Sequence, residues 1–298
     1  MISYDAFTKD FAGRRAVDAL TLEVGRGSVV ALLGPNGSGK TTTIKGAAGL
    51  VRPSSGAVRL GDPARSALDP RARRRCSFLP QRVAFPDTLT GREVVEFYRR
   101  LRGADADATE RVLKFASLNG AGTRAVGTYS GGMLQRLGLA VAMVPDADIL
   151  LLDEPTAALD PDGLCALYGL IDERRRAGAA VLFSSHQLGD VERLADHIAV
   201  LAEGRLVALM TERELADRLA TRGVLRVRLA RRLPGMVQRL RDCWPTAQWL
   251  GDELIVPAAA NVRPAVLDAI RETGGEITGL TAQEGRLDDL YRELTERR

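Results

Sequence analysis

The chain has 298 residues, a net charge of +4 and a hydrophobic content of 45%, which is ordinary for a globular protein of one or two domains. Its three cysteines are widely spaced, which excludes a disulfide framework and a Cys/His zinc site and favours a reducing compartment. No stretch approaches the roughly 18 consecutive apolar residues of a spanning helix, and the N-terminus lacks a signal segment. We therefore expect a membrane role only through a partner.

Residues 1–26 alternate between polar and apolar positions, which predicts one or two antiparallel strands. Apolar runs at 28–33, 148–152 and 179–183 predict buried strands, and residues 92–118 and 132–144 are typical of helices. Continuous apolar strands that alternate with helices indicate a parallel sheet covered on both faces. In such a sheet, functional side chains gather at the carboxyl ends of the strands.

The pattern changes after about residue 211. We predict strands at 224–229, 249–256 and 276–281 and helices at 235–244, 262–273 and 286–296. The last helix carries an apolar stripe, which favours internal packing over a partner surface. The sequence thus predicts two domains, residues 1–210 and a small α+β domain at 211–298.

Residues 34–41 read Gly-Pro-Asn-Gly-Ser-Gly-Lys-Thr, which fits the phosphate-binding loop G-x-x-x-x-G-K-[ST] between a strand and a helix. The glycines allow successive backbone N–H groups to point at phosphates, where the positive end of the following helix assists. Lys40 is expected to reach the β- and γ-phosphates, and the Thr41 hydroxyl to bind Mg²⁺. The pattern predicts binding of a nucleoside triphosphate.

Asp153 and Glu154 end the apolar run at 148–152. An aspartate at this point can hold the Mg²⁺ that bridges the phosphates, and the neighbouring glutamate can act as general base toward water. An acid pair after a strand is often structural, but its order after a phosphate loop favours catalysis.

Several motifs resemble those of ATP-binding cassette (ABC) ATPases across residues 1 to about 210. Tyr129-Ser130-Gly131-Gly132-Met133 is similar to the family's signature motif, in the variant common in its exporter branch. Residues 152–156 and 158–160 resemble the Walker B motif and the D-loop. Gln81 stands where the family has its Q-loop, His186 where it has its switch histidine, and Phe11 where an aromatic ring stacks on adenine.

The resemblance implies an α/β P-loop NTPase cassette with a parallel sheet core, an antiparallel β subdomain and a helical subdomain, followed by the α+β domain. It implies Glu154, His186 and Gln81 as catalytic residues and Thr41, Gln81 and Asp153 around Mg²⁺. The residues implied to bind ATP are Phe11, Gly34, Pro35, Asn36, Gly37, Ser38, Gly39, Lys40, Thr41, Thr42, Ser130, Gly131 and Gly132.

The resemblance also implies a head-to-tail dimer, expected to be a homodimer, that closes on two ATP molecules and opens after hydrolysis. A separate transmembrane permease would dock near residues 82–102, which places the chain at the cytoplasmic face of the inner membrane, and no nucleic-acid partner is expected. The signature variant and residues 287–291 resemble ABC-2-type exporter subunits, and more loosely the ATPase of nitrous oxide reductase copper-site maturation. Two alternatives stay open: an ABC ATPase of translation or DNA repair, and a C-terminal domain that binds a regulatory ligand.

Overall fold

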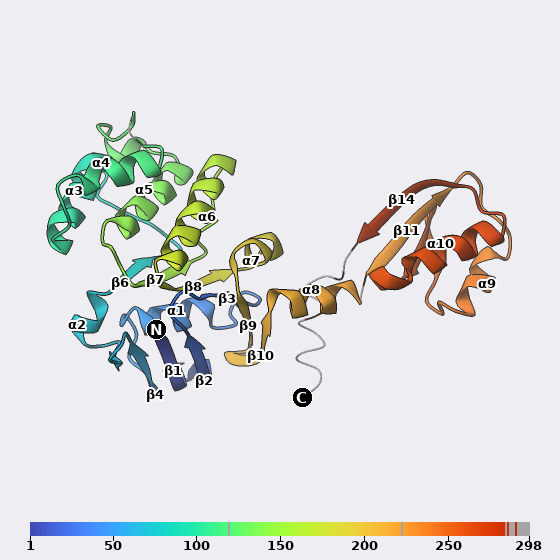
Figure 1. Cartoon of the computed structure of the whole chain (residues 1–298), viewed down its shortest axis with the longest axis horizontal. Coiled ribbons are helices and arrows are strands. Elements are labelled where there is room, and N and C mark those ends of the chain that lie inside the picture. The colour runs from blue at the N-terminus through green and yellow to red at the C-terminus, as the bar shows by residue number, and fades with distance from the viewer. Residues whose placement is uncertain (119, 222, 284, 286–289, 291–298) are drawn as a thin grey trace. The chain divides into compact units, whose positions relative to one another are not determined.

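The computed structural model describes residues 1–118, 120–221, 223–283, 285 and 290. Its contacts divide the chain into two compact units, Met1–Glu212 and Arg213–Arg298 (Figure 1). The division lies close to the 210/211 boundary expected from the sequence, and independent domain status stays a prediction. The helix predicted at 286–296 lies outside the described residues, apart from Leu290.

In its described residues, the first unit contains ten strands, seven α-helices and a short 3-10 helix at Val126–Thr128. Its strands are β1 (Ile2–Phe11), β2 (Arg14–Val24), β3 (Val29–Leu33), β4 (Ser55–Leu60), β5 (Arg65–Ser66), β6 (Cys76–Leu79), β7 (Ile149–Asp153), β8 (Ala180–Ser185), β9 (His197–Ala202) and β10 (Arg205–Thr211). Its helices are α1 (Lys40–Ala47), α2 (Pro70–Arg73), α3 (Gly91–Arg102), α4 (Ala108–Phe115), α5 (Gly131–Met143), α6 (Pro161–Arg176) and α7 (Leu188–Leu194). Helix α8 (Glu212–Ala220) follows β10.

The larger sheet of the first unit has the order β10-β9-β3-β8-β7-β6, and all of its pairs are parallel except β10 with β9. Every residue of β3, β7 and β8 is buried, as expected for strands covered on both faces. The predicted parallel sheet is confirmed. Because β3, β6, β7 and β8 run in the same direction, the segments that follow them emerge at one edge of the sheet.

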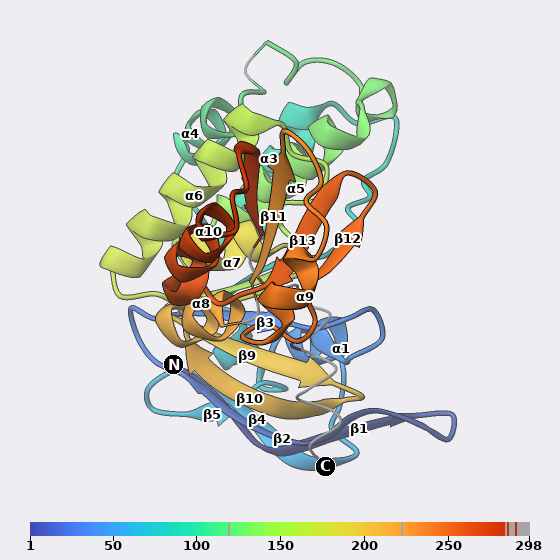
Figure 2. The same cartoon turned by 90° about the vertical axis from the view of Figure 1, so that its right-hand side faces the viewer.

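A second, antiparallel sheet has the order β2-β1-β4-β5. Figure 2 shows it as a layer against β9 and β10, and helix α1 contacts strands of both sheets. The Tyr4 hydroxyl donates a hydrogen bond of 2.9 Å to the carbonyl of Thr43, which fixes α1 against the antiparallel layer. One apolar core joins both sheets and includes the fully buried Phe7, Leu32 and Ile44.

Helices α3, α4 and α5 pack on one another and form the helical part of the first unit (Figure 1). The single helical stretch predicted at 92–118 is two helices. Helix α3 begins with a capping box made by Thr90 and Glu93 and ends at Gly103, whose φ of 65° stops the helix. In the described residues, no helix is long and apolar enough to cross a membrane.

The second unit contains β11 (Val224–Leu229), α9 (Met236–Arg241), β12 (Gln248–Leu250), β13 (Glu253–Pro257), α10 (Arg263–Glu272) and β14 (Ile277–Gln283). The strand predicted at 249–256 is a hairpin, which turns at Gly251 with a φ of 59°. The antiparallel order β12-β13-β11-β14 and the β-α-β-β-α-β succession make a split β-α-β fold of ferredoxin-like topology. Residues of both helices pack on one face of this sheet, including Met236 and Val266.

Candidate functional site

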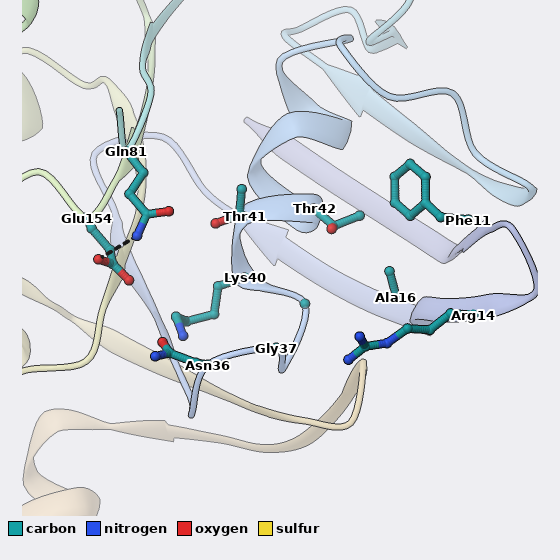
Figure 3. Close-up of a pocket in the computed structure, with 11 residues that line it drawn as sticks. Phe11, Arg14, Ala16, Asn36, Gly37, Lys40, Thr41, Thr42, Gln81 and Glu154 are labelled. Carbon is teal, nitrogen blue, oxygen red and sulfur yellow. Dashed lines mark hydrogen bonds between the residues drawn. The ribbon is translucent and has the colours of Figure 1, made fainter. Parts of the chain in front are cut away.

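A cavity of about 490 Å³ opens at the carboxyl end of β3, between the phosphate loop and the β1–β2 turn (Figure 3). Its floor is the loop that leads into α1, and its walls come from three further segments. The lining residues are Phe11, Arg14, Ala16, Asn36, Gly37, Gly39, Lys40, Thr41, Thr42, Gln81 and Glu154. Nine of these were expected from the sequence; Arg14 and Ala16 were not.

Glycine is required in the loop by both conformation and space. Gly37 and Gly39 adopt φ angles of 83° and 102°, which L side chains rarely adopt. A Cβ on Gly39 would lie 2.6 Å from the carbonyl oxygen of Ala16. A Cβ on Gly34 would lie 2.3 Å from the carbonyl oxygen of Leu201. The loop is therefore locked between β2 and β9, and its curl presents the positive end of α1 to the cavity.

Lys40, the first residue of α1, is 6% exposed. Its Nζ donates hydrogen bonds to the carbonyls of Gly34 at 2.6 Å and Pro35 at 3.1 Å. Burial lowers the pKa of this ammonium group, and the negative charges of Glu154 and Asp153 oppose that shift. The side chain thus bends over the loop, where its charge faces the cavity that an anion would enter.

Asp153 is 1% exposed and ends β7. Its Oδ1 accepts hydrogen bonds from Thr41 Oγ1 at 3.1 Å and from Ser184 Oγ at 2.7 Å. Its Oδ2 is buried and has no hydrogen-bond partner among the described residues. An unsatisfied buried carboxylate oxygen is costly, and beside a hydroxyl oxygen it is a ligand that Mg²⁺ prefers. The residues present therefore fit a magnesium site that phosphate oxygens and water complete.

Glu154 follows β7 with a φ of 49°, a strained value for a residue other than glycine. Its backbone N–H donates to Ser184 Oγ at 2.9 Å. Its side chain is contacted by two residues. Gln81 Nε2 donates a hydrogen bond to Oε2 at 3.0 Å (Figure 3), and His186 Nδ1 lies 3.7 Å from Oε1. Three segments that are distant in the sequence therefore meet at one carboxylate beside the cavity.

The signature residues lie elsewhere. Ser130 caps α5 by accepting a hydrogen bond of 3.2 Å from the N–H of Met133, and it is exposed. Ser130, Gly131 and Gly132 are not among the residues that line the cavity. Within one chain, the structure does not bring this motif to the phosphate loop.

Two contributions were missed by reasoning from the sequence. Arg14 follows the turn after Phe11, and in Figure 3 its guanidinium group points toward Gly37 across the cavity. Ser184 pairs with Asp153 between the parallel strands β7 and β8, and its hydroxyl bonds both Asp153 Oδ1 and the backbone N–H of Glu154. A signal for Ser184 was present, since it is the polar end of a buried strand, like Asp153.

Comparison with known proteins agrees with this geometry. The sequence profile described as ABC transporter matches residues 17–157. The chain is 33% identical over 304 residues to the daunorubicin resistance ATP-binding protein DrrA3 of Streptomyces coeruleorubidus, covering 99% of this chain and 95% of that protein. It is 40% identical over 233 residues to the daunorubicin/doxorubicin resistance ATP-binding protein DrrA of Streptomyces peucetius, covering 76% and 70%. A dimeric structure of a bacterial ABC transporter cassette superimposes with a TM-score of 0.64 at 26% identity, and the match covers 71% of this chain and 99% of that chain.

Replacing Gly39 with alanine tests the loop geometry. The new Cβ would meet the Ala16 carbonyl at a strained φ, so we expect the first turn of α1 to shift, at a cost of about 1–3 kcal/mol. Nucleotide affinity, measured with a fluorescent ATP analogue, should fall about tenfold or more. Gly25→Ala is the matched control, because its Cβ has only Ser28 Cβ nearby, at 4.0 Å. Equal affinity in the two variants would contradict the geometric argument.

Proposed function

The chain belongs to the ABC transporter family as an ATP-binding, ATP-hydrolysing subunit, and on that premise we propose that it powers an ABC-2-type exporter as a homodimer. One observation carries the proposal. The phosphate loop, Gln81 and Glu154 line a single cavity, whereas Ser130, Gly131 and Gly132 are not among the residues that line it, and Ser130 and Gly131 are exposed. A head-to-tail pair of chains brings each signature motif to the other chain's cavity, so ATP is bound between the two subunits.

The nucleotide is held by the loop and by the β1–β2 turn. Phe11 is 47% exposed at the edge of the cavity and offers its ring to adenine. Lys40 exchanges its bonds to the Gly34 and Pro35 carbonyls for phosphate oxygens, assisted by the N–H groups of the loop. Thr41 and Asp153, with Gln81, would hold Mg²⁺, which would supply positive charge to the phosphate oxygens.

Glu154 is the general base. Its carboxylate takes a proton from water as the water oxygen bonds to the γ-phosphorus and the bond to the β–γ bridging oxygen breaks, which yields ADP and phosphate. Gln81 and His186 hold this carboxylate from two sides. His186 also reaches the γ-phosphate. The Ser130 hydroxyl and the N–H groups at the start of α5 in the second subunit complete the site.

A separate permease is the proposed membrane partner. Helix α3 exposes Phe97 and Leu101 by 59% and 66%, and Leu50 is 62% exposed. Nearby, a cavity of about 320 Å³ between α3, α5 and β6 includes Leu50 and Tyr98 in its lining. Exposed apolar groups of this kind mark interaction sites. Helix α3 lies within residues 82–102, the segment that directly follows Gln81. Docking of the permease on α3 would therefore link the permease to the γ-phosphate and place the chain at the cytoplasmic face of the inner membrane.

Export is supported by the relatives named for resistance to daunorubicin and doxorubicin. The similarity to DrrA3 extends over 99% of this chain and therefore includes the second unit. The cavity at the phosphate loop is assigned to ATP. Specificity for the transported molecule would therefore lie in the permease.

Lys40→Ala should weaken ATP binding tenfold to a hundredfold, since it removes charge-assisted hydrogen bonds of about 1.5–3 kcal/mol. Equilibrium titration with a fluorescent ATP analogue measures the change. Lys45→Ala, in the same helix and outside the cavity lining, is the matched control and should bind normally. Unchanged affinity in Lys40→Ala would overturn the phosphate assignment.

Glu154→Gln keeps the size of the side chain and removes its basicity. We expect ATP binding to persist and turnover to fall about 10²–10⁴-fold, so that the ATP-bound dimer accumulates. Steady-state phosphate release and size-exclusion chromatography with ATP measure the two effects. Turnover near that of the unmodified chain would eliminate Glu154 as the base.

Affinity purification of the chain from detergent-solubilised membranes of its own organism should recover a polytopic membrane protein in stoichiometric amount. Substituting both Phe97 and Leu101 with serine should abolish this recovery while leaving ATP binding intact. The matched control is Leu209→Ser, an exposed leucine on β10. Recovery with ribosomes or nucleic acid, and without a membrane protein, would reject the transporter assignment while leaving the ATPase chemistry in place.

A further inference from the structure

Asp190 is a buried carboxylate in α7 that is not part of the nucleotide cavity. It is 4% exposed, and its charge is met by three hydroxyl groups. Oδ2 accepts hydrogen bonds from Thr156 Oγ1 at 2.6 Å and Ser185 Oγ at 3.1 Å. Oδ1 accepts one from the Tyr168 hydroxyl at 2.8 Å.

A carboxylate buried without a cation is expensive, and it persists only where hydrogen bonds satisfy it. Bonds from hydroxyl groups to a charged acceptor are short and strong, and they fix the direction of each donor. A buried network of this kind holds its members in one geometry if every member is satisfied. The question is therefore which segments Asp190 holds together.

Two of the three hydroxyls belong to the catalytic loops. Thr156 lies two residues after Glu154, and Ser185 immediately precedes His186. The Ser185 oxygen also accepts a hydrogen bond of 2.9 Å from the N–H of Gln187, so one hydroxyl fixes the backbone on both sides of His186. Asp190 orients the Ser185 hydroxyl and, through Thr156, also anchors the loop that follows Glu154.

We propose that Asp190 is a positioning residue for ATP hydrolysis, which holds His186 at a fixed place beside the Glu154 carboxylate. It acts through Thr156 and Ser185 and does not touch the nucleotide. The 3.7 Å separation between His186 Nδ1 and Glu154 Oε1 is the geometry that it maintains. This inference rests on the roles proposed above for Glu154 and His186.

The third hydroxyl, that of Tyr168, provides a control that separates a positioning role of Asp190 from a general contribution to stability. Tyr168 lies in α6 and connects Asp190 to a helix that carries no catalytic side chain. Burial and the bond to Asp190 raise the pKa of Tyr168 to about 12, so the phenol is a neutral donor at physiological pH. Removing this hydroxyl takes away one hydrogen bond from the Asp190 carboxylate. The bonds of Asp190 to Thr156 and Ser185 remain.

The experiment compares full-length variants for kcat, ATP affinity and melting temperature. Asp190→Asn replaces one acceptor oxygen with a donor, so the hydroxyl donors can no longer all be satisfied. We expect kcat to fall roughly tenfold to a hundredfold, as a small misplacement of catalytic groups does. ATP affinity should stay within about twofold, since the phosphate loop is untouched. Asp190→Glu, which keeps the charge, should recover part of kcat.

Thr156→Val and Ser185→Ala each remove one hydrogen bond to Asp190, and Ser185→Ala also removes the bond from the Gln187 N–H. Both should lower kcat. Tyr168→Phe should lower the melting temperature while kcat stays within about twofold. Should Asp190→Asn fail to fold, the Thr156 and Ser185 variants decide. Normal kcat in both, or equal loss of kcat in Tyr168→Phe, would overturn the positioning role.

These outcomes separate this inference from the proposed function. If Glu154→Gln loses turnover while Asp190→Asn keeps it, only the role of Asp190 fails. If Glu154→Gln retains turnover, the assignment of the base fails first, whatever the Asp190 variants do.

Discussion

The buried Asp153 carboxylate ties helix α1 to the central sheet of the first unit. The charge sits at the end of β7 with 1% of the residue exposed, so it must be satisfied from within the protein. Thr41 reaches it from α1 and Ser184 from β8, and both bond the same oxygen. These two contacts fix the first turn of α1 relative to the central sheet. The other oxygen remains unpaired among the described residues, on the side where Mg²⁺ and phosphates would bind.

Strand β8 contacts a second buried carboxylate as well as Asp153, because successive side chains of a strand point to opposite faces. Ser184 bonds Asp153 and the N–H of Glu154, whereas Ser185 bonds Asp190. Adjacent serines thus link two buried carboxylates on either side of the loop that carries Glu154. We interpret this pair as the reason that His186, which is itself 55% exposed, can keep a defined place.

The proposed division of the nucleotide site between two chains would give these local contacts a mechanical consequence. In the proposed dimer, one chain supplies the phosphate loop, the acids and Gln81, and the second chain supplies Ser130 and the start of α5. In that dimer, a γ-phosphate bound by both chains would favour closure, and its loss after hydrolysis would favour opening. The exposed surface of α3, in the segment that follows Gln81 in the chain, is where we propose that such a movement reaches a permease.

The sequence alone determined the phosphate loop, the parallel sheet and the order of the candidate site residues along the chain, because these depend on local backbone requirements and on hydrophobic periodicity. It also located most second-unit elements, although it merged β12 with β13 because only two residues, Gly251 and Asp252, separate the two strands. It did not identify Arg14, Ser184 or Asp190 as functional candidates. Their significance arises from contacts between segments far apart in the chain, such as Thr156 with Asp190. Only the tertiary structure decided those contacts, since packing of the sheet and helices sets which hydroxyl meets which carboxylate.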